Sequence, residues 1–242
     1  MPFLAYNTLI DFDMKEKAEN SVDKIQDLID SLSKLENEFL LSSQRILNAG
    51  NRKLYALDLL ANAVNNRAIQ LMKGFVILIK DDNYISAVPL IRLQLDNGMR
   101  FFATSLVSNY NDLFMHFLDG KPLKNFKDAK GKPLTDIYLA TKLNEYFPGT
   151  LELYKSSSGY IHLSERHLFA TIVSTKKSEM SISQVVGGKP DTFTLMDKTN
   201  FTFTMYQISK LVLVVVEQWK HQKDKISKIL DENYLTDGKF SE

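Results

Sequence analysis

Cysteine is missing from all 242 residues of the chain. Without a thiol the protein can form no disulfide, offers no thiolate nucleophile, and cannot build a cysteine-based zinc or iron–sulfur site. This composition fits a cytoplasmic protein best. The amino-terminal sequence MPFLAYNTLIDFDMKEK also lacks a basic segment followed by an apolar one, so we expect no secretory signal there.

Long apolar runs and catalytic signatures are missing as well. The longest apolar runs, residues 75–79 and 211–216, are far shorter than the roughly 20 residues that span a bilayer, so we expect no segment to cross a membrane. The chain contains no GxSxG, HExxH, EF-hand or helix-opening GxGxxG pattern. Glu217 and His221 could offer two metal ligands from one helix face, but two ligands do not close a site. We therefore expect no metal site and no cofactor.

Neither sign of charge is in excess, because 30 basic side chains stand against 29 acidic ones. Binding to nucleic acid would therefore depend on a local cluster of basic side chains. Five lysines lie in the segment 121–132, which glycine and proline mark as a loop. This loop is either a solvated excursion or a basic lip that attracts an anion, and its aspartates favour the first interpretation.

Helical periodicity dominates the rest of the sequence and predicts an all-α, up-and-down bundle with long helices. Alternating β-branched and polar residues around Gly187 to Asp191 predict a small hairpin or flap before the last helix, one that could cover a site as a lid. Helices are expected over 20–48, 52–80, 84–108, 112–118, 135–147 and 151–157, after an N-cap at Ser164, and over 200–230. We expect one domain over 1–242, made of an N-terminal segment (1–19), the bundle (20–172), the flap (174–199) and a core helix (200–232).

The first long helix carries a heptad stripe, which has two interpretations. It either packs inside the bundle or forms the seam of a coiled-coil dimer, and its short length favours packing. The stripe consists of Ile25, Leu28, Leu32, Leu35, Phe39, Ser42 and Ile46.

The segment YKSSSGYIHLSERHLF, residues 154–169, holds two of the four histidines. Histidine is the side chain whose ordinary pKa lies nearest neutral pH, so the candidate site is Tyr160, His162, Arg166 and His167. If a helix begins just before them, Arg166 and His167 point about 100° apart and cannot face one cavity. His162 is then the favoured acid or base, whereas a structural role is favoured for His167.

Arg92, Asp96 and Arg100 follow one another at four-residue spacing on the third long helix. In the structural interpretation, Asp96 neutralises a half-buried Arg92. In the functional one, the two guanidinium groups hold a phosphate or a carboxylate. The structural interpretation is favoured, because such intrahelical pairs are common.

The segments LIRLQLDNGMRFF and YKSSSGYIHLS, with the order of the long helices, resemble uncharacterised bacterial proteins related to the HEPN superfamily, including abortive-infection and toxin-type members. The resemblance covers residues 56–174. It implies an all-helical bundle that often dimerises and, in active members, metal-independent RNA cleavage by an arginine and a histidine at the dimer interface. Arg92 with Asp96, and Tyr160 with His162, match the pattern.

One part of the pattern is absent. Active members carry an arginine and then a histidine with four to six residues between them, whereas here Arg166 directly precedes His167, and His162 comes before both. Two functions therefore stay open. The first is an RNA-binding or ribonuclease-type protein of host defence, with His162 and Arg92 as catalytic residues and Arg166, Tyr160, Asp96 and Arg100 binding RNA or a nucleotide. The second is a non-catalytic helical interaction protein that homodimerises.

Overall fold

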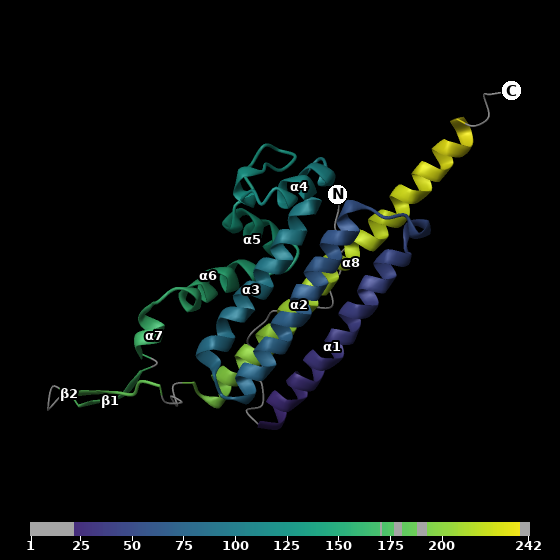
Figure 1. The fold of residues 1–242 in the computed structure, drawn as a ribbon. Helices are drawn as coiled ribbons and strands as arrows, with labels where there is room; N and C mark the ends of the chain where they lie inside the picture. Colours follow the sequence, from purple (N-terminus) through teal and green to yellow (C-terminus); the bar gives the residue numbers. More distant parts are fainter. Residues whose placement is uncertain (1–21, 170, 177–180, 188–192, 238–242) are drawn as a thin grey trace.

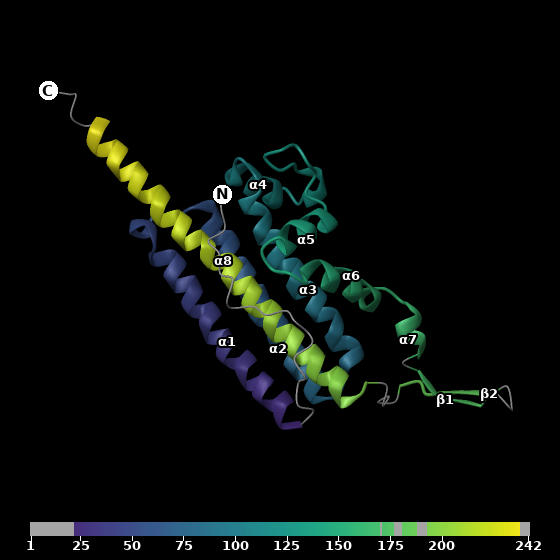
Figure 2. The same cartoon turned by 180° about the vertical axis from the view of Figure 1, so that it is seen from behind.

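The computed structural model describes residues 22–169, 171–176, 181–187 and 193–237. Within these ranges, long helices form an up-and-down bundle, which confirms the expected all-α fold (Figures 1 and 2). The bundle helices are α1 (Val22–Asn48), α2 (Ala56–Lys80), α3 (Tyr84–Phe102) and α8 (Leu195–Asp237). Both α1 and α3 pack against α2 and α8. The expected N-terminal segment, 1–19, lies outside the described residues.

The chain between α3 and α8 adds shorter elements on the α3 side of the bundle (Figure 1). Of these, α5 and α6 pack against α3, and α4 contacts α2. The helices are α4 (Tyr110–Leu118), α5 (Asp136–Asn144), α6 (Thr150–Ile161) and α7 (Glu165–Phe169), with 3-10 turns at Ala103–Ser105 and Leu123–Asn125. A further 3-10 turn, Gly50–Arg52, joins α1 to α2. The strands β1 (Ile172–Lys176) and β2 (Ser181–Gln184) form an antiparallel hairpin.

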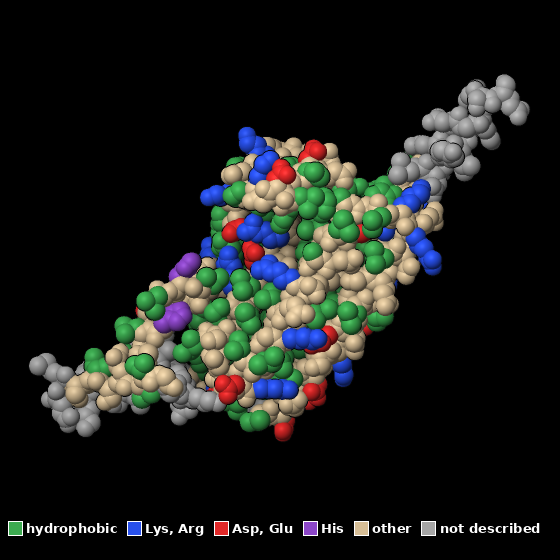
Figure 3. Space-filling model, viewed as in Figure 1, with side chains coloured by type: hydrophobic (Ala, Val, Ile, Leu, Met, Phe, Trp, Pro, Cys, Tyr) green, Lys and Arg blue, Asp and Glu red, His purple; other side chains and the backbone are tan. Residues whose placement is uncertain are grey.

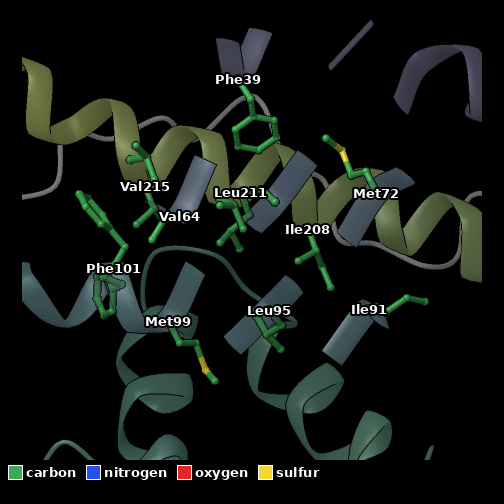
Figure 4. Packing of buried hydrophobic residues seen from close by; sticks show 14 of the residues in the cluster. Phe39, Val64, Met72, Ile91, Leu95, Met99, Phe101, Ile208, Leu211 and Val215 are labelled. Carbon is green, nitrogen blue, oxygen red and sulfur yellow. The ribbon is translucent and has the colours of Figure 1, made fainter. Parts of the chain in front are cut away.

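The heptad stripe of α1 is buried within this chain. Leu32 and Phe39 are 1% and 0% exposed, and only Ile25 of the stripe is partly exposed. Figure 4 shows Phe39 among core side chains of the other bundle helices, including Met72 and Leu211. Burial stabilises the fold by about 1.5–3 kcal/mol for each large apolar side chain. The bundle interpretation of the stripe is therefore confirmed, and a dimer seam on this stripe is wrong.

Helix α6 continues through the serine-rich segment to Ile161, four residues past its expected end at 157. Ser157 Oγ donates to the carbonyl of Leu153 at 2.6 Å, and Ser158 Oγ donates to that of Tyr154 at 2.9 Å. Serines that bond back to the preceding turn fit inside a helix. The expected end of this helix at residue 157 is therefore wrong.

The hairpin also differs from its expected form. The segment SISQ is its second strand, because Lys176 pairs with Ser181 across the joining residues 177–180. The expected turn around Gly187 to Asp191 lies largely outside the described residues. The hairpin points away from the bundle in both views, so it does not cover the candidate site as a lid (Figures 1 and 2).

Helix α8 begins at Leu195, five residues before the expected start at 200. The cause is a cap at Thr194, whose N–H and hydroxyl both donate to the carboxylate of Asp197, while Asp197 N–H donates back to the hydroxyl. Among the described residues, every helix is too short or too polar to span a lipid bilayer.

Candidate functional site

Arg92 lies in the interface between α3 and α6 and is only 8% exposed. Its guanidinium carbon sits 3.7 Å from the centre of the Tyr154 ring. Its Nη1 donates to the Tyr154 carbonyl at 3.1 Å and to Ser158 Oγ at 3.4 Å. The cation is therefore balanced by an aromatic face and a helix carbonyl, and the side chain ties α6 to α3.

Asp96 pairs with other arginines than Arg92. Its carboxylate accepts from Arg100 Nε at 3.2 Å and lies 3.8 Å from Arg67 Nη1. Arg100 also donates to Asp136 at 3.0 Å, which links α3 to α5. The expectation that Asp96 neutralises Arg92 is therefore wrong. Asp96 pairs instead with Arg100, one helical turn further along α3, and both residues serve to hold the fold together.

His162 ends α6 with extended backbone (φ −108°, ψ 150°) and an exposed side chain. It forms no hydrogen bond or ion pair with the part of the chain that the structure describes. The residue follows Ser158, the contact of Arg92, by one helical turn, about 6 Å along the axis. Tyr160 packs its ring edge-on against Phe201 at 5.9 Å, so it joins α6 to α8. Of the predicted site residues in α6, His162 alone remains available to a ligand.

The α7 residues contribute less than their chemistry suggests. Ser164 N–H donates to His167 Nδ1 at 3.2 Å, so this imidazole caps the short helix. The structural role favoured for His167 agrees with this geometry. Arg166 lies on α7, but its side chain is outside the described residues. Figure 3 shows histidine and apolar side chains over the α6 and α7 region, with lysines and arginines gathered further along the bundle.

The sequence patterns did not predict a buried polar cluster formed by Asp58, Trp219 and Lys223. Lys223 Nζ bonds to Asp58 Oδ2 at 2.9 Å and to the carbonyl of Ile46 at 2.8 Å, while Trp219 Nε1 donates to Asp58 Oδ1 at 2.7 Å. Both ion-pair side chains are fully buried. The signal was present, since Lys223 follows Trp219 by one turn on the apolar stripe of α8. Groups so enclosed hold helices together and do not meet a ligand.

The lysine-rich loop is built around one carboxylate. Asp128 Oδ1 accepts the backbone N–H groups of Lys130 and Lys132 at 2.9 and 2.7 Å, and Oδ2 accepts the Tyr138 hydroxyl at 2.6 Å. Burial raises the pKa of Asp128, but these hydrogen bonds outweigh it and lower the pKa below its ordinary value. Burial, then the bond to Asp128, raises the pKa of Tyr138 to about 12. The lysine-rich loop is therefore an ordered surface loop whose conformation is fixed by hydrogen bonds to Asp128.

The α1–α8 surface holds a further set of titratable groups. A shallow groove of about 400 Å³ includes Arg45, Glu217 and His221. Glu217 accepts from Arg45 at 2.9 Å, so its carboxylate is already paired. Among the described residues, no three histidine, aspartate or glutamate side chains come together as metal ligands.

Taken together, the site offers an exposed imidazole at the end of α6, one helical turn beyond the serine that contacts the buried Arg92. An exposed imidazole can exchange a proton with a ligand, but catalysis also needs a group that holds the reacting atoms. Arg92 is turned into the α3–α6 interface and does not supply one in this arrangement. Comparisons with protein-family models, curated proteins and solved structures found no match for the chain.

Proposed function

We propose that this protein is a non-catalytic helical interaction protein that homodimerises through a projecting arm. The arm consists of the described residues within 161–187, which include α7 and the hairpin. Its exposed apolar side chains carry the proposal: Leu163 is 92% and Val186 89% exposed. Ile161, Leu168, Ile182 and Val185 are exposed as well.

Apolar side chains gathered on a projecting segment are typical of an interaction surface. The arm extends from the bundle in both views, so the bundle does not cover it (Figures 1 and 2). Covering one such side chain at an interface contributes on the order of 1.5–3 kcal/mol before the costs of association. The alternative dimer surface, the α1 stripe, is already used inside the chain.

The state of Arg92 supports a non-catalytic role. Its guanidinium bonds to the carbonyl of Tyr154 and stacks on that ring, so binding a phosphate would require it to leave both contacts. A buried arginine that leaves its partners loses about 1.5–3 kcal/mol for the charged hydrogen bond alone.

Sedimentation velocity of the full chain tests the proposal. Leu163→Ser with Val186→Ser should raise the dimer dissociation constant by at least about tenfold, because each change removes apolar area from the interface. Ile77→Ser is the matched control, since Ile77 is 68% exposed and belongs to α2, outside the arm. Equal effects of the arm and control variants would contradict the proposed surface.

A second candidate is the HEPN-like, RNA-directed function in host defence, and the exposed His162 favours it. An exposed imidazole at the end of α6, without a partner among the residues that the structure describes, can act as acid or base on a bound RNA. Incubation of total RNA with the wild type and with His162→Ala tests this candidate. Cleavage that disappears in the variant would support it, and equal background cleavage by both proteins would exclude it.

A further inference from the structure

The β1–β2 hairpin carries strand edges that no third strand covers within the described residues. Its strands pair only with each other, as a two-stranded sheet. The hairpin also points away from the bundle helices (Figures 1 and 2). Because an isolated two-stranded hairpin is marginally stable in water, it gains much from another strand.

The register identifies the backbone groups on the outer edge of β2. Val185 N–H donates to the carbonyl of Thr171 at 2.9 Å, so Val185 faces the β1 side. Backbone groups of successive strand residues point to opposite sides, and the register shift lies on β1, which leaves β2 regular. Ser183 therefore faces β1 as well, while Ile182 and Gln184 direct their N–H and C=O groups outward.

This outer edge lacks the side chains that usually protect an edge strand against pairing. Natural edge strands are commonly guarded by lysine, other charges or proline. The strand SISQ contains none of these, and all its residues are exposed.

We infer that β2 pairs antiparallel with β2 of a second copy about a two-fold axis at Ser183. The inference rests on the proposed homodimer and names its surface. Ile182 of each copy exchanges backbone hydrogen bonds with Gln184 of the other, giving about four bonds. Two strands from each copy then form one continuous sheet. Since β2 carries no charge, the two-fold pairing brings no like charges together, so two copies of the strand can pair without repulsion.

A cross-linking experiment tests the register, because the chain has no cysteine of its own. The two-fold axis sets Ser183 opposite its counterpart as a non-hydrogen-bonded pair with Cα atoms about 4.5 Å apart, within disulfide range. With an added oxidant that accepts the two electrons and two protons, Ser183→Cys should cross-link at least about ten times faster than Ser181→Cys. Ser181→Cys is the control, because the two-fold pairing sets position 181 opposite Val185 of the second copy and not opposite position 181. Equal rates for the two variants would overturn the inference.

Sedimentation of three full-length proteins separates the inference from the proposed function. Ile182→Pro removes an outward N–H but no bond to β1, so it should raise the dimer dissociation constant by at least about tenfold. Ile182→Thr keeps the backbone N–H and should change the dimer dissociation constant much less. If the wild type is a dimer and Ile182→Pro does not weaken it, the edge pairing is wrong but the proposed homodimer is not. A wild type that is monomeric at every concentration overturns both.

Discussion

Lys223 Nζ lies 2.9 Å from Asp58 Oδ2, and neither side chain is exposed to solvent. The pair joins α8 to the start of α2, where Asp58 also accepts the N–H of Tyr55 at 2.8 Å. The ammonium reaches the carbonyl of Ile46 near the end of α1 as well. One buried pair thus ties three bundle helices together at the same end.

Breaking this pair should destabilise the bundle strongly. Lys223→Met leaves the Asp58 carboxylate buried without its cation, which costs about 3–5 kcal/mol of unfolding free energy. Urea unfolding measures the loss. Lys220→Met is the matched control, because its partly exposed pair with Asp224 is worth about 0–1 kcal/mol. Similar losses for the two variants would show that the buried pair does not hold the bundle.

Gly50 should tolerate no side chain. Its φ is +57°, and an added Cβ would come 2.9 Å from Lys223 Cγ. Gly120 has a similar φ of +65° but open space around it. We expect Gly120→Ala to cost about 1 kcal/mol for backbone strain alone and Gly50→Ala clearly more. Thermal unfolding of both variants checks this, and equal losses would remove the steric argument.

Arg92 should act on stability through its planar group as well as its charge. Arg92→Lys keeps the cation but loses the stacked guanidinium, so we expect a loss of about 1–3 kcal/mol. Arg67→Lys should change stability by less than about 0.5 kcal/mol, because the Arg67 side chain is 44% exposed and lies 3.8 Å from Asp96. If Arg92→Lys unfolds like the wild type in urea, the stacked guanidinium of Arg92 does not stabilise the packing of α6 on α3.

The Tyr138–Asp128 contact should make stability depend on alkaline pH. The pKa of Tyr138 is raised to about 12 in the fold, so its contribution is fully present below about pH 10, the unfolded pKa. The contribution is lost as the pH rises from there through about 12. The stability gap between wild type and Tyr138→Phe should therefore shrink over this range in urea unfolding. A constant gap would contradict the assignment.

The Tyr138–Asp128 contact should also make stability depend on acid pH, where stability falls as the pH falls. The pKa of Asp128 is lowered in the fold, so its contribution is present above about pH 3.9, its unfolded pKa, and is lost as the pH falls through the folded value. Asp128→Asn should therefore lose less stability than the wild type between about pH 5 and pH 2. Parallel curves would show that another carboxylate controls the acid transition.

The fold was predictable because its helices carry strong local signals. The heptad stripe predicts both the helix α1 and the face of it that is buried. Asn83, at the predicted start of α3, caps that helix by accepting the N–H of Ser86 at 3.2 Å. The end of α6 was less predictable because of its serines. Whether Ser157 bonds back along a helix or caps a turn depends on packing against α3.

The candidate site was less predictable, because its residues are defined by partners far away in the sequence. The spacing of Arg92 and Asp96 suggests a pair, but Arg92 meets Tyr154, which lies 62 residues later. Lys223 meets Asp58 across 165 residues. Such contacts arise only when the bundle closes, so local periodicity cannot reveal them.

Sedimentation equilibrium of the wild-type chain over a wide concentration range tests the central claim most directly. A homodimer predicts a mass that rises from the 27.7 kDa of one chain toward twice that value as concentration increases. A mass that stays at 27.7 kDa at every concentration would contradict the proposed interaction function.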